Sequence, residues 1–284
     1  MRIASFLHKG RTSFGAILGD RISDLGGLER PGARDLQSVL AHDDSLETLK
    51  SLCEAGLTDI GIDEIRLLPP VPKPSKIICI GVNYKSHIVE CGMTMPEHPW
   101  VFTRFSNSVV GHREAIVRPT ASTHYDYEGE LALVIGKSGR QIKKSDALRH
   151  IFGYSCFNDG SVRDFQNHTD QYTPGKNFWR SGSFGPWIVT TDEIDDPNRL
   201  QLTTKLNGET MQSASVGDLY FDIPTLIEYC STFTELEPGD VIVTGTPGGV
   251  GFARTPPVWL KAGDKLEVEI SQIGTLRNTV EDES

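Results

Sequence analysis

The stretch Asp126–Gly136, with the sequence DYEGELALVIG, places three carboxylates immediately before a run of apolar residues. In an extended strand, successive side chains alternate between the two faces, so Asp126, Glu128 and Glu130 would all point the same way. Three acids on one strand face, beside residues that should be buried, favour a bound cation. Carboxylate oxygens suit Mg²⁺, Mn²⁺ or Ca²⁺ rather than Zn²⁺.

Two interpretations of these acids are open at this point. The first is a divalent metal site, and the second is a strand end whose acids point into water. A further acidic segment downstream, Phe157–Asp164 with the sequence FNDGSVRD, favours the metal site.

The formal net charge of −10 over 284 residues argues against a nucleic-acid partner and against an anionic membrane surface. An anionic substrate would therefore have to meet local cations, namely a metal ion and a few basic side chains. No apolar run approaches the length needed to span a bilayer, and the segment Met1–Gly10 turns polar too early for a signal peptide. The five cysteines are scattered and contain no C-x-x-C pair, which predicts reduced thiols in a cytoplasmic protein.

Residues 1–70 form a first unit, predicted as a small N-terminal α/β domain. It combines a hairpin with two segments of helical spacing. A run of prolines then predicts an extended linker, because proline neither donates ladder hydrogen bonds nor continues a helix. We place the domain boundary there, with residues 71–284 as the catalytic domain. The hairpin strands are Ile3–Leu7 and Ser13–Leu18, the helices are Leu36–Leu40 and Leu46–Cys53, and the prolines are Pro69, Pro70, Pro72 and Pro74.

The second unit consists mainly of short β-like runs separated by glycine and proline. The continuous apolar strand Lys76–Val82 opens it, and the clearest helical signal is Ile223–Phe233, with Asp222 as a candidate cap before Pro224. The regular strand–helix alternation of a Rossmann domain or a TIM barrel is absent, so the predicted fold class is α+β and strand-rich. The other β-like runs are Ala115–Val117, Gly129–Ile135, Phe152–Phe157, Pro186–Thr190, Leu202–Leu206, Val241–Thr244 and Lys265–Ser271, and Glu281–Ser284 looks like a frayed tail.

His87 and Glu90 lie three residues apart, in what looks like one helical turn after the first strand of the second unit. At that spacing Glu90 could accept a hydrogen bond from one imidazole nitrogen. Such a bond would fix the tautomer and raise the basicity of the other nitrogen, which is what a general base needs. The alternative is an incidental pair on an exposed helix.

The loop Gly245–Gly251 follows a β-like run but matches neither a Walker A loop nor a dinucleotide fingerprint. Its glycines would let backbone N–H groups approach an anion, and Thr246 could donate its hydroxyl to a substrate carboxylate; a tight turn between strands is the alternative. Lys176 and Arg163 are candidate local cations. The histidines and cysteines show no zinc spacing, and no serine-nucleophile elbow is present.

Seven segments, in order along the chain, carry a family resemblance: Ile80–Glu90, Asp126–Ala132, Asn158–Gln166, Gly185–Val189, Asn207–Glu209, Pro238–Gly251 and Ala262–Asp264. Together they resemble the fumarylacetoacetate hydrolase family over residues 75–280. The specificity of this match comes from the ensemble, because no single segment is diagnostic.

The resemblance implies a mixed β-sandwich roll that binds one Mg²⁺ or Mn²⁺, with Ca²⁺ as a further option. An E-x-E pair and a downstream aspartate of the family match Glu128, Glu130 and Asp159, so Asp126 becomes a supporting acid rather than a ligand. Three carboxylates would leave about three octahedral positions for a 2-oxo carboxylate and one water. The family also implies a homodimer.

The resemblance also assigns roles to residues around the metal. The family's His–Glu dyad on a short lid helix matches His87 and Glu90, and its substrate-side lysine matches Lys176, which makes these three the candidate catalytic residues. The candidate substrate-binding residues are Tyr84, Arg163, Gln166 and Thr246.

The sequence departs from the family pattern in two places. The run Lys176–Arg180 replaces a commoner glycine–phenylalanine–aspartate run, which leaves the substrate open. Arg104 stands where a lysine is more usual, and the two side chains are not equivalent as hydrogen-bond donors. Phe178 and Trp179, with Tyr84, suggest tolerance for carbon chains.

The leading functional hypothesis is a metal-dependent hydrolase that cleaves a carbon–carbon bond in acylpyruvate-like 1,3-diketo acids, as in aromatic catabolism. It would release pyruvate or a related oxo-acid: His87 would deprotonate water, Lys176 would stabilise the oxyanion, and the metal would polarise the oxo group. The alternative is a decarboxylase or isomerase of oxaloacetate or of a homoprotocatechuate-pathway intermediate. A third hypothesis, from a different class, is a non-enzymatic metal- or anion-binding protein.

Overall fold

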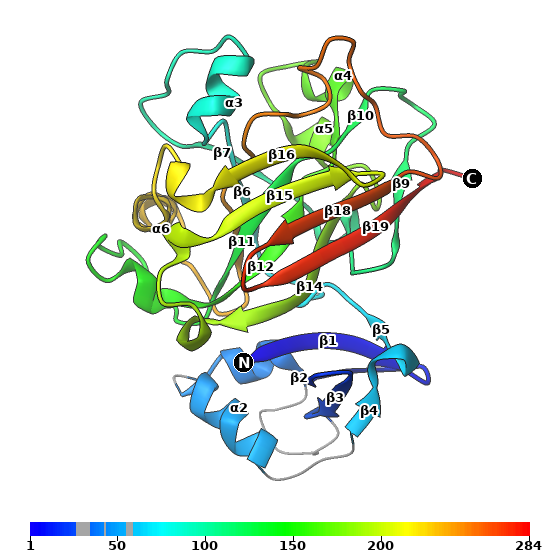
Figure 1. Cartoon of the computed structure of the whole chain (residues 1–284). Coiled ribbons are helices and arrows are strands. Elements are labelled where there is room, and N and C mark those ends of the chain that lie inside the picture. The colour runs from blue at the N-terminus through cyan, green and yellow to red at the C-terminus, as the bar shows by residue number, and fades with distance from the viewer. Residues whose placement is uncertain (27–34, 43, 55–58) are drawn as a thin grey trace.

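The computed structural model describes residues 1–26, 35–42, 44–54 and 59–284. Its strands form a large mixed sheet, a five-stranded sheet packed against it, and a two-stranded ladder (Figure 1). The predicted strand-rich α+β class is therefore confirmed. The large sheet has the order β4 (Asp59–Gly61), β3 (Arg21–Asp24), β2 (Arg11–Leu18), β1 (Arg2–His8), β14 (Gly182–Thr190), β12 (Ile151–Asn158), β11 (Gly129–Ile135), β17 (Val241–Val243), β6 (Ile77–Gly81) and β7 (Trp100–Thr103). β5 (Arg66–Leu67) pairs with β1, and β8 (Val109–Val110) pairs with β14.

The apolar strand β11 lies in the middle of the fold and is buried on both faces. Leu131 and Leu133 belong to a cluster shared with the five-stranded sheet, whereas Ala132 and Val134 belong to a cluster that includes the N-terminal strands and helices. A continuous apolar run is the pattern expected for such a doubly covered strand. The five-stranded sheet has the order β16 (Glu209–Ser215), β15 (Gln201–Leu206), β18 (Lys265–Ile270), β19 (Gly274–Asp282) and β9 (Ala115–Arg118).

The N-terminal segment extends the large sheet. β1 pairs with β14, with Ile3 opposite Ile188, and both residues belong to one hydrophobic cluster. The predicted hairpin is confirmed as β1 and β2, and the two predicted helices as α1 (Leu36–Leu40) and α2 (Ser45–Glu54). Residues 68–76 contain neither helix nor strand, as the prolines predict. The domain boundary near residue 70 stays a prediction.

The predicted helix after Asp222 is confirmed as α6 (Ile223–Phe233). The Asp222 carboxylate accepts the Thr225 N–H at 2.8 Å, which satisfies one of the free donors of the first turn. Three shorter helices, α3 (Lys85–Glu90), α4 (Arg163–Gln166) and α5 (Thr173–Lys176), gather at the end of the molecule opposite the N-terminal strands (Figure 1). Among the described residues, no helix combines the length and apolar character needed to cross a membrane. The 3₁₀ helices are Ile62–Glu64, Ser106–Ser108, Ala147–His150, Thr191–Glu193, Pro197–Arg199 and Val216–Asp218.

The C-terminus differs from the frayed tail that the sequence predicts. β19 continues to Asp282 and pairs with β9, and the Arg118 guanidinium binds the Asp282 carboxylate with an Nε–Oδ1 distance of 2.7 Å. A short polar tail carries no periodic signal, because its pairing partner lies far away in the sequence. The edge strands β7 and β16 were not predicted either, although β16 pairs with the adjacent β15 across a two-residue turn.

Candidate active site

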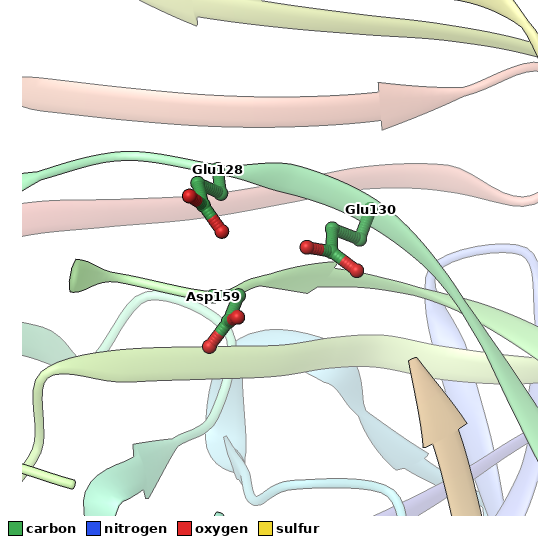
Figure 2. Close-up of side chains that lie close together, drawn as sticks. All are labelled: Glu128, Glu130 and Asp159. Carbon is green, nitrogen blue, oxygen red and sulfur yellow. The ribbon is translucent and has the colours of Figure 1, made fainter. Parts of the chain in front are cut away.

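Three buried carboxylates meet at the start of β11 and the end of β12 (Figure 2). The pairing register places Gly129 opposite Asn158, and the Asp159 N–H donates to the Glu128 carbonyl at 2.8 Å, so the two acidic segments lie side by side. One carboxylate oxygen from each of Glu128, Glu130 and Asp159 lies within 4.8 Å of the others. The structure therefore brings together the three predicted metal ligands.

Basic side chains surround two of these carboxylates. Lys176 Nζ lies 2.6 Å from Glu128 Oε2 and 2.8 Å from Asp159 Oδ2, and Arg163 Nη1 lies 2.6 Å from Glu128 Oε1. Burial alone would raise the pKa of Glu128, but the Lys176 and Arg163 charges outweigh burial and lower that pKa to about 2. Burial and the like charges of Asp159 and Glu128 instead raise the pKa of Glu130 well above its ordinary value.

The residues present fit a divalent cation. Glu130 is buried beside the like charges of Asp159 and Glu128, and among the described residues it forms no ion pair with a basic side chain. Burying an excess of negative charge is costly unless a counter-ion compensates it. Glu128, Glu130 and Asp159 would hold such an ion, and oxygen-only ligands match Mg²⁺ or Mn²⁺.

Asp126 occupies the supporting position that the resemblance implies. It accepts hydrogen bonds from Arg163 Nε at 2.9 Å and from the Gly251 N–H at 2.8 Å. It thereby fixes the guanidinium that contacts Glu128, and it is not part of the three-residue ligand cluster.

His87 and Glu90 form the predicted pair on α3, with Nδ1 and Oε1 2.7 Å apart. The other Glu90 oxygen accepts the Gly249 N–H at 2.8 Å, so this acid joins α3 to the glycine-rich loop. Burial lowers the pKa of His87, but hydrogen bonds with Cys91 and Glu90 and the charge of Glu128 outweigh burial and raise that pKa to about 9.

The glycine-rich loop Gly245–Gly251 binds carboxylates of the protein itself. Its Gly245 N–H donates to Glu130 Oε2 at 2.5 Å, and its other amides reach Glu90 and Asp126. The Thr246 hydroxyl donates to the Gly129 carbonyl at 3.0 Å and accepts from Gln212 at 2.8 Å. Its proton is therefore already engaged within the protein.

A cavity of about 210 Å³ opens above the carboxylates. Most of the predicted site residues line it. Glu90 and Asp159 do not, but Glu90 binds His87 and Asp159 binds Lys176, and both of these partners line the cavity. Tyr84 does not line it: this side chain is fully buried in the core, and Phe178 and Trp179 are also outside the cavity wall. The predicted residues that line the cavity are His87, Glu128, Glu130, Arg163, Gln166, Lys176 and Thr246.

Apolar residues complete the cavity wall. They come from separate parts of the chain, and the sequence analysis did not single them out, because no periodicity marks which loop side chains face a cavity. They are Ile80, Val82, Met93, Phe102, Tyr172 and Phe252.

Arg104, noted in the sequence as a departure from the family, holds the predicted metal ligand Asp159. Its Nη1 lies 2.5 Å from Asp159 Oδ1 and 3.0 Å from the Gly160 carbonyl, and Nη2 lies 2.9 Å from Ser181 Oγ. Nε and Nη2 also donate to Ser108, so the buried guanidinium makes five hydrogen bonds. A lysine ammonium has only three donors and cannot reproduce this planar fork.

Arg104→Lys should therefore weaken divalent-cation binding by about 10- to 100-fold, the usual cost of disturbing a partner of a metal ligand. Calorimetric titration with Mn²⁺ measures the effect. Arg118→Lys is the matched control, because it disrupts a bidentate pair with Asp282 that lies away from the cavity. Equal Mn²⁺ affinity in Arg104→Lys and the unmodified protein would contradict this role.

A buried carboxylate centre in a strand-rich roll, facing a His–Glu pair on a short helix, defines the class of protein. The family model described as fumarylacetoacetate (FAA) hydrolase C-terminal matches residues 76–281. The chain belongs to the fumarylacetoacetate hydrolase family, and the resemblance seen in the sequence is confirmed.

One curated protein and two solved structures show how similar the chain is to individual relatives. Oxaloacetate tautomerase YisK of Bacillus subtilis (strain 168) is 46% identical over 231 residues, which cover 80% of this chain and 77% of that protein. The structure of a fumarylacetoacetate hydrolase from psychrophilic Exiguobacterium antarcticum is 36% identical, with a TM-score of 0.85. That of maleylpyruvate hydrolase from Sphingobium sp. SYK-6, in complex with manganese(II) ion and pyruvate, is 30% identical, with a TM-score of 0.83. Both structural matches cover 100% of each chain.

Proposed function

We propose that this chain is a metal-dependent tautomerase that interconverts the keto and enol forms of oxaloacetate. The observation that carries the proposal is the His87 imidazole, held by Glu90, lining a small cavity above three buried carboxylates. A cavity of about 210 Å³ is smaller than those that hold drug-sized ligands, and it suits a four-carbon acid. The similarity to an oxaloacetate tautomerase supports this alternative over the hydrolase that led the sequence analysis.

In the proposed reaction, one proton moves between C3 of oxaloacetate and its 2-oxo oxygen, and each active-site side chain has a separate role. A bound Mg²⁺ or Mn²⁺, held by Glu128, Glu130 and Asp159, would supply a Lewis acid that polarises the 2-oxo group. His87 takes a proton from C3, and the C–H electron pair forms the C2–C3 double bond as the carbonyl oxygen gains charge. Return of the proton to that oxygen completes the enol, and the reverse steps restore the ketone. Lys176, near the carboxylates, stabilises the developing oxyanion.

Hydrolysis of acylpyruvate-like substrates is the second candidate. The same His87–Glu90 pair could deprotonate a water molecule instead of a carbon acid. The structural similarity to a maleylpyruvate hydrolase supports this candidate. Decarboxylation of oxaloacetate uses the same enolate chemistry but releases CO₂, so the products distinguish all three reactions.

The test is an assay of enol-oxaloacetate loss by ultraviolet absorbance with Mg²⁺ or Mn²⁺, compared with the same metal without protein. We expect the protein to accelerate ketonisation and a chelator to abolish the acceleration. Parallel samples measure CO₂ release and hydrolysis of an acylpyruvate. Acylpyruvate cleavage without faster ketonisation would replace the tautomerase with the hydrolase, and metal binding without any turnover would favour the non-enzymatic hypothesis.

The expected setting of the protein follows from the same inference. A small oxo-acid is the proposed partner of the site. A homodimer, a cytoplasmic location and the absence of nucleic-acid and membrane partners stay predictions.

A further inference from the structure

We infer that an aromatic subsite adjoins the active-site cavity and binds the ring of an aryl-substituted 2-oxo acid; this rests on the proposed function for the acid's oxo-carboxylate head. The subsite is a hollow of about 480 Å³ lined by Pro96–Phe102, Asp170–Tyr172 and Tyr229. These segments come from β7 and the loop before it, from the loop between α4 and α5, and from α6.

The hollow shares two walls with the active-site cavity. Phe102 and Tyr172 line both spaces, and their rings lie 5.9 Å apart. Lys176 Nζ lies 5.1 Å from the Phe102 ring, so this ring lies between the Lys176 ammonium and the hollow. A Cβ on Gly81 would lie 3.5 Å from Tyr172 and 3.8 Å from Trp100, so the β6 backbone lies beside these aromatic residues.

The wall of the hollow is suited to a flat apolar group. The Trp100 and Tyr172 rings lie 5.8 Å apart at an interplanar angle of 56°, and the His98 and Tyr229 rings lie 6.1 Å apart and are stacked. Trp100 is 41% exposed, which leaves ring surface available to a ligand. Ring pairs at such separations attract one another beyond simple area burial, so a ligand ring would add to this set.

The charges of the two spaces determine which end of a ligand each accepts. Lys176 and Arg163 line the active-site cavity, whereas Glu97 and Asp170 line the hollow. Among the described residues, no lysine or arginine lines the hollow. A ligand carrying its carboxylate beside the 2-oxo group and an uncharged aryl ring at the other end fits both, whereas a second carboxylate in the hollow would be repelled.

The test compares pyruvate with phenylpyruvate, because the two acids share their head and differ in the ring. Calorimetric titration of the Mg²⁺-loaded protein should show phenylpyruvate binding at least about 10-fold more tightly. Trp100→Ala should remove most of that preference, and Tyr229→Ala on α6 should reduce it independently. Trp179→Ala is the matched control: this ring is 56% exposed and lines neither space, so the preference should persist.

Equal affinities for the two acids would overturn the subsite, and so would a preference that survives both Trp100→Ala and Tyr229→Ala. Oxaloacetate turnover separates this outcome from the proposed function, because oxaloacetate carries no ring that the hollow could bind. Ketonisation by Trp100→Ala at the unmodified rate, with the aryl preference lost, supports both inferences. Absence of ketonisation in the unmodified protein would overturn the tautomerase and leave the affinity ratio to decide the subsite.

Discussion

Glu130→Gln should weaken divalent-cation binding by at least about 100-fold and lower oxaloacetate turnover by about 1,000-fold. Glu130 is one of the three clustered carboxylates, and among the described residues it forms no ion pair like that of Lys176 with Glu128. The Gln amide oxygen can still accept the Gly245 N–H that now reaches Glu130, so the loop contact survives while the charge is lost. The variant therefore isolates the charge that a cation needs.

Two measurements check this prediction. Calorimetric titration with Mn²⁺ gives the affinity, and thermal unfolding without metal shows whether the variant folds. We expect the metal-free variant to be at least as stable as the unmodified protein, because a buried acid among like charges has become neutral. Glu114→Gln is the matched control, since Glu114 also accepts a backbone N–H but lies outside the carboxylate cluster. Unchanged Mn²⁺ affinity in Glu130→Gln would disprove the metal site.

His87→Gln should leave Mn²⁺ affinity nearly unchanged but lower ketonisation by about 100- to 10,000-fold, the range that general acid–base catalysis contributes. The imidazole lines the cavity, but its ion-pair partner is Glu90 and it is not part of the three-carboxylate cluster. Exchange of the C3 hydrogens with deuterium, followed by NMR, reports the proton step directly. An unchanged exchange rate in His87→Gln would assign the proton transfer to another group.

Two further variants sharpen that test. His124→Gln is the matched control, because His124 lies 3.6 Å from the Asp164 carboxylate but lines no part of the cavity. Glu90→Gln removes the carboxylate whose hydrogen bond helps to raise the pKa of His87 to about 9. The pKa of His87 should then fall, and because the neutral imidazole is the base, the rising limb of kcat/KM should move to lower pH.

Patterns within single elements predicted much of the fold and of the site. Most of the predicted β-like runs are strands in the structure, and Asp222 is the N-cap of α6. Both predictions succeeded because alternating burial and helix caps depend on residues close in sequence. The pair His87 and Glu90 follows from helical spacing for the same reason. Alternation also placed Glu128 and Glu130 on one side of the chain.

Contacts between distant segments could not be predicted in this way. Tyr84 follows an apolar strand and was placed beside the substrate, but neighbouring layers enclose it in the core. The Thr246 hydroxyl was predicted to bind a substrate carboxylate. In the structure it instead donates to the Gly129 carbonyl and accepts from Gln212, and both partners lie on other strands. Arg104 was noted only as a departure, because its five hydrogen bonds go largely to residues far along the chain.

The acidic segment Asp126–Gly136 shows both sides of this division. The sequence by itself determined the apolar strand that follows the acids, since an apolar run is a local property of the chain. The single strand face predicted for the three acids is wrong, because Asp126 lies in β10 (Tyr125–Asp126), which pairs with β13 (Ser161–Val162), whereas Glu130 lies in β11 of the large sheet. Only the tertiary structure decided that Asp159 completes the cluster, through the β11–β12 register, and that Asp126 binds Arg163 and a loop instead. The physical reason is that burial forces each carboxylate to find a partner, and the packing of distant strands and loops determines which partners are within reach.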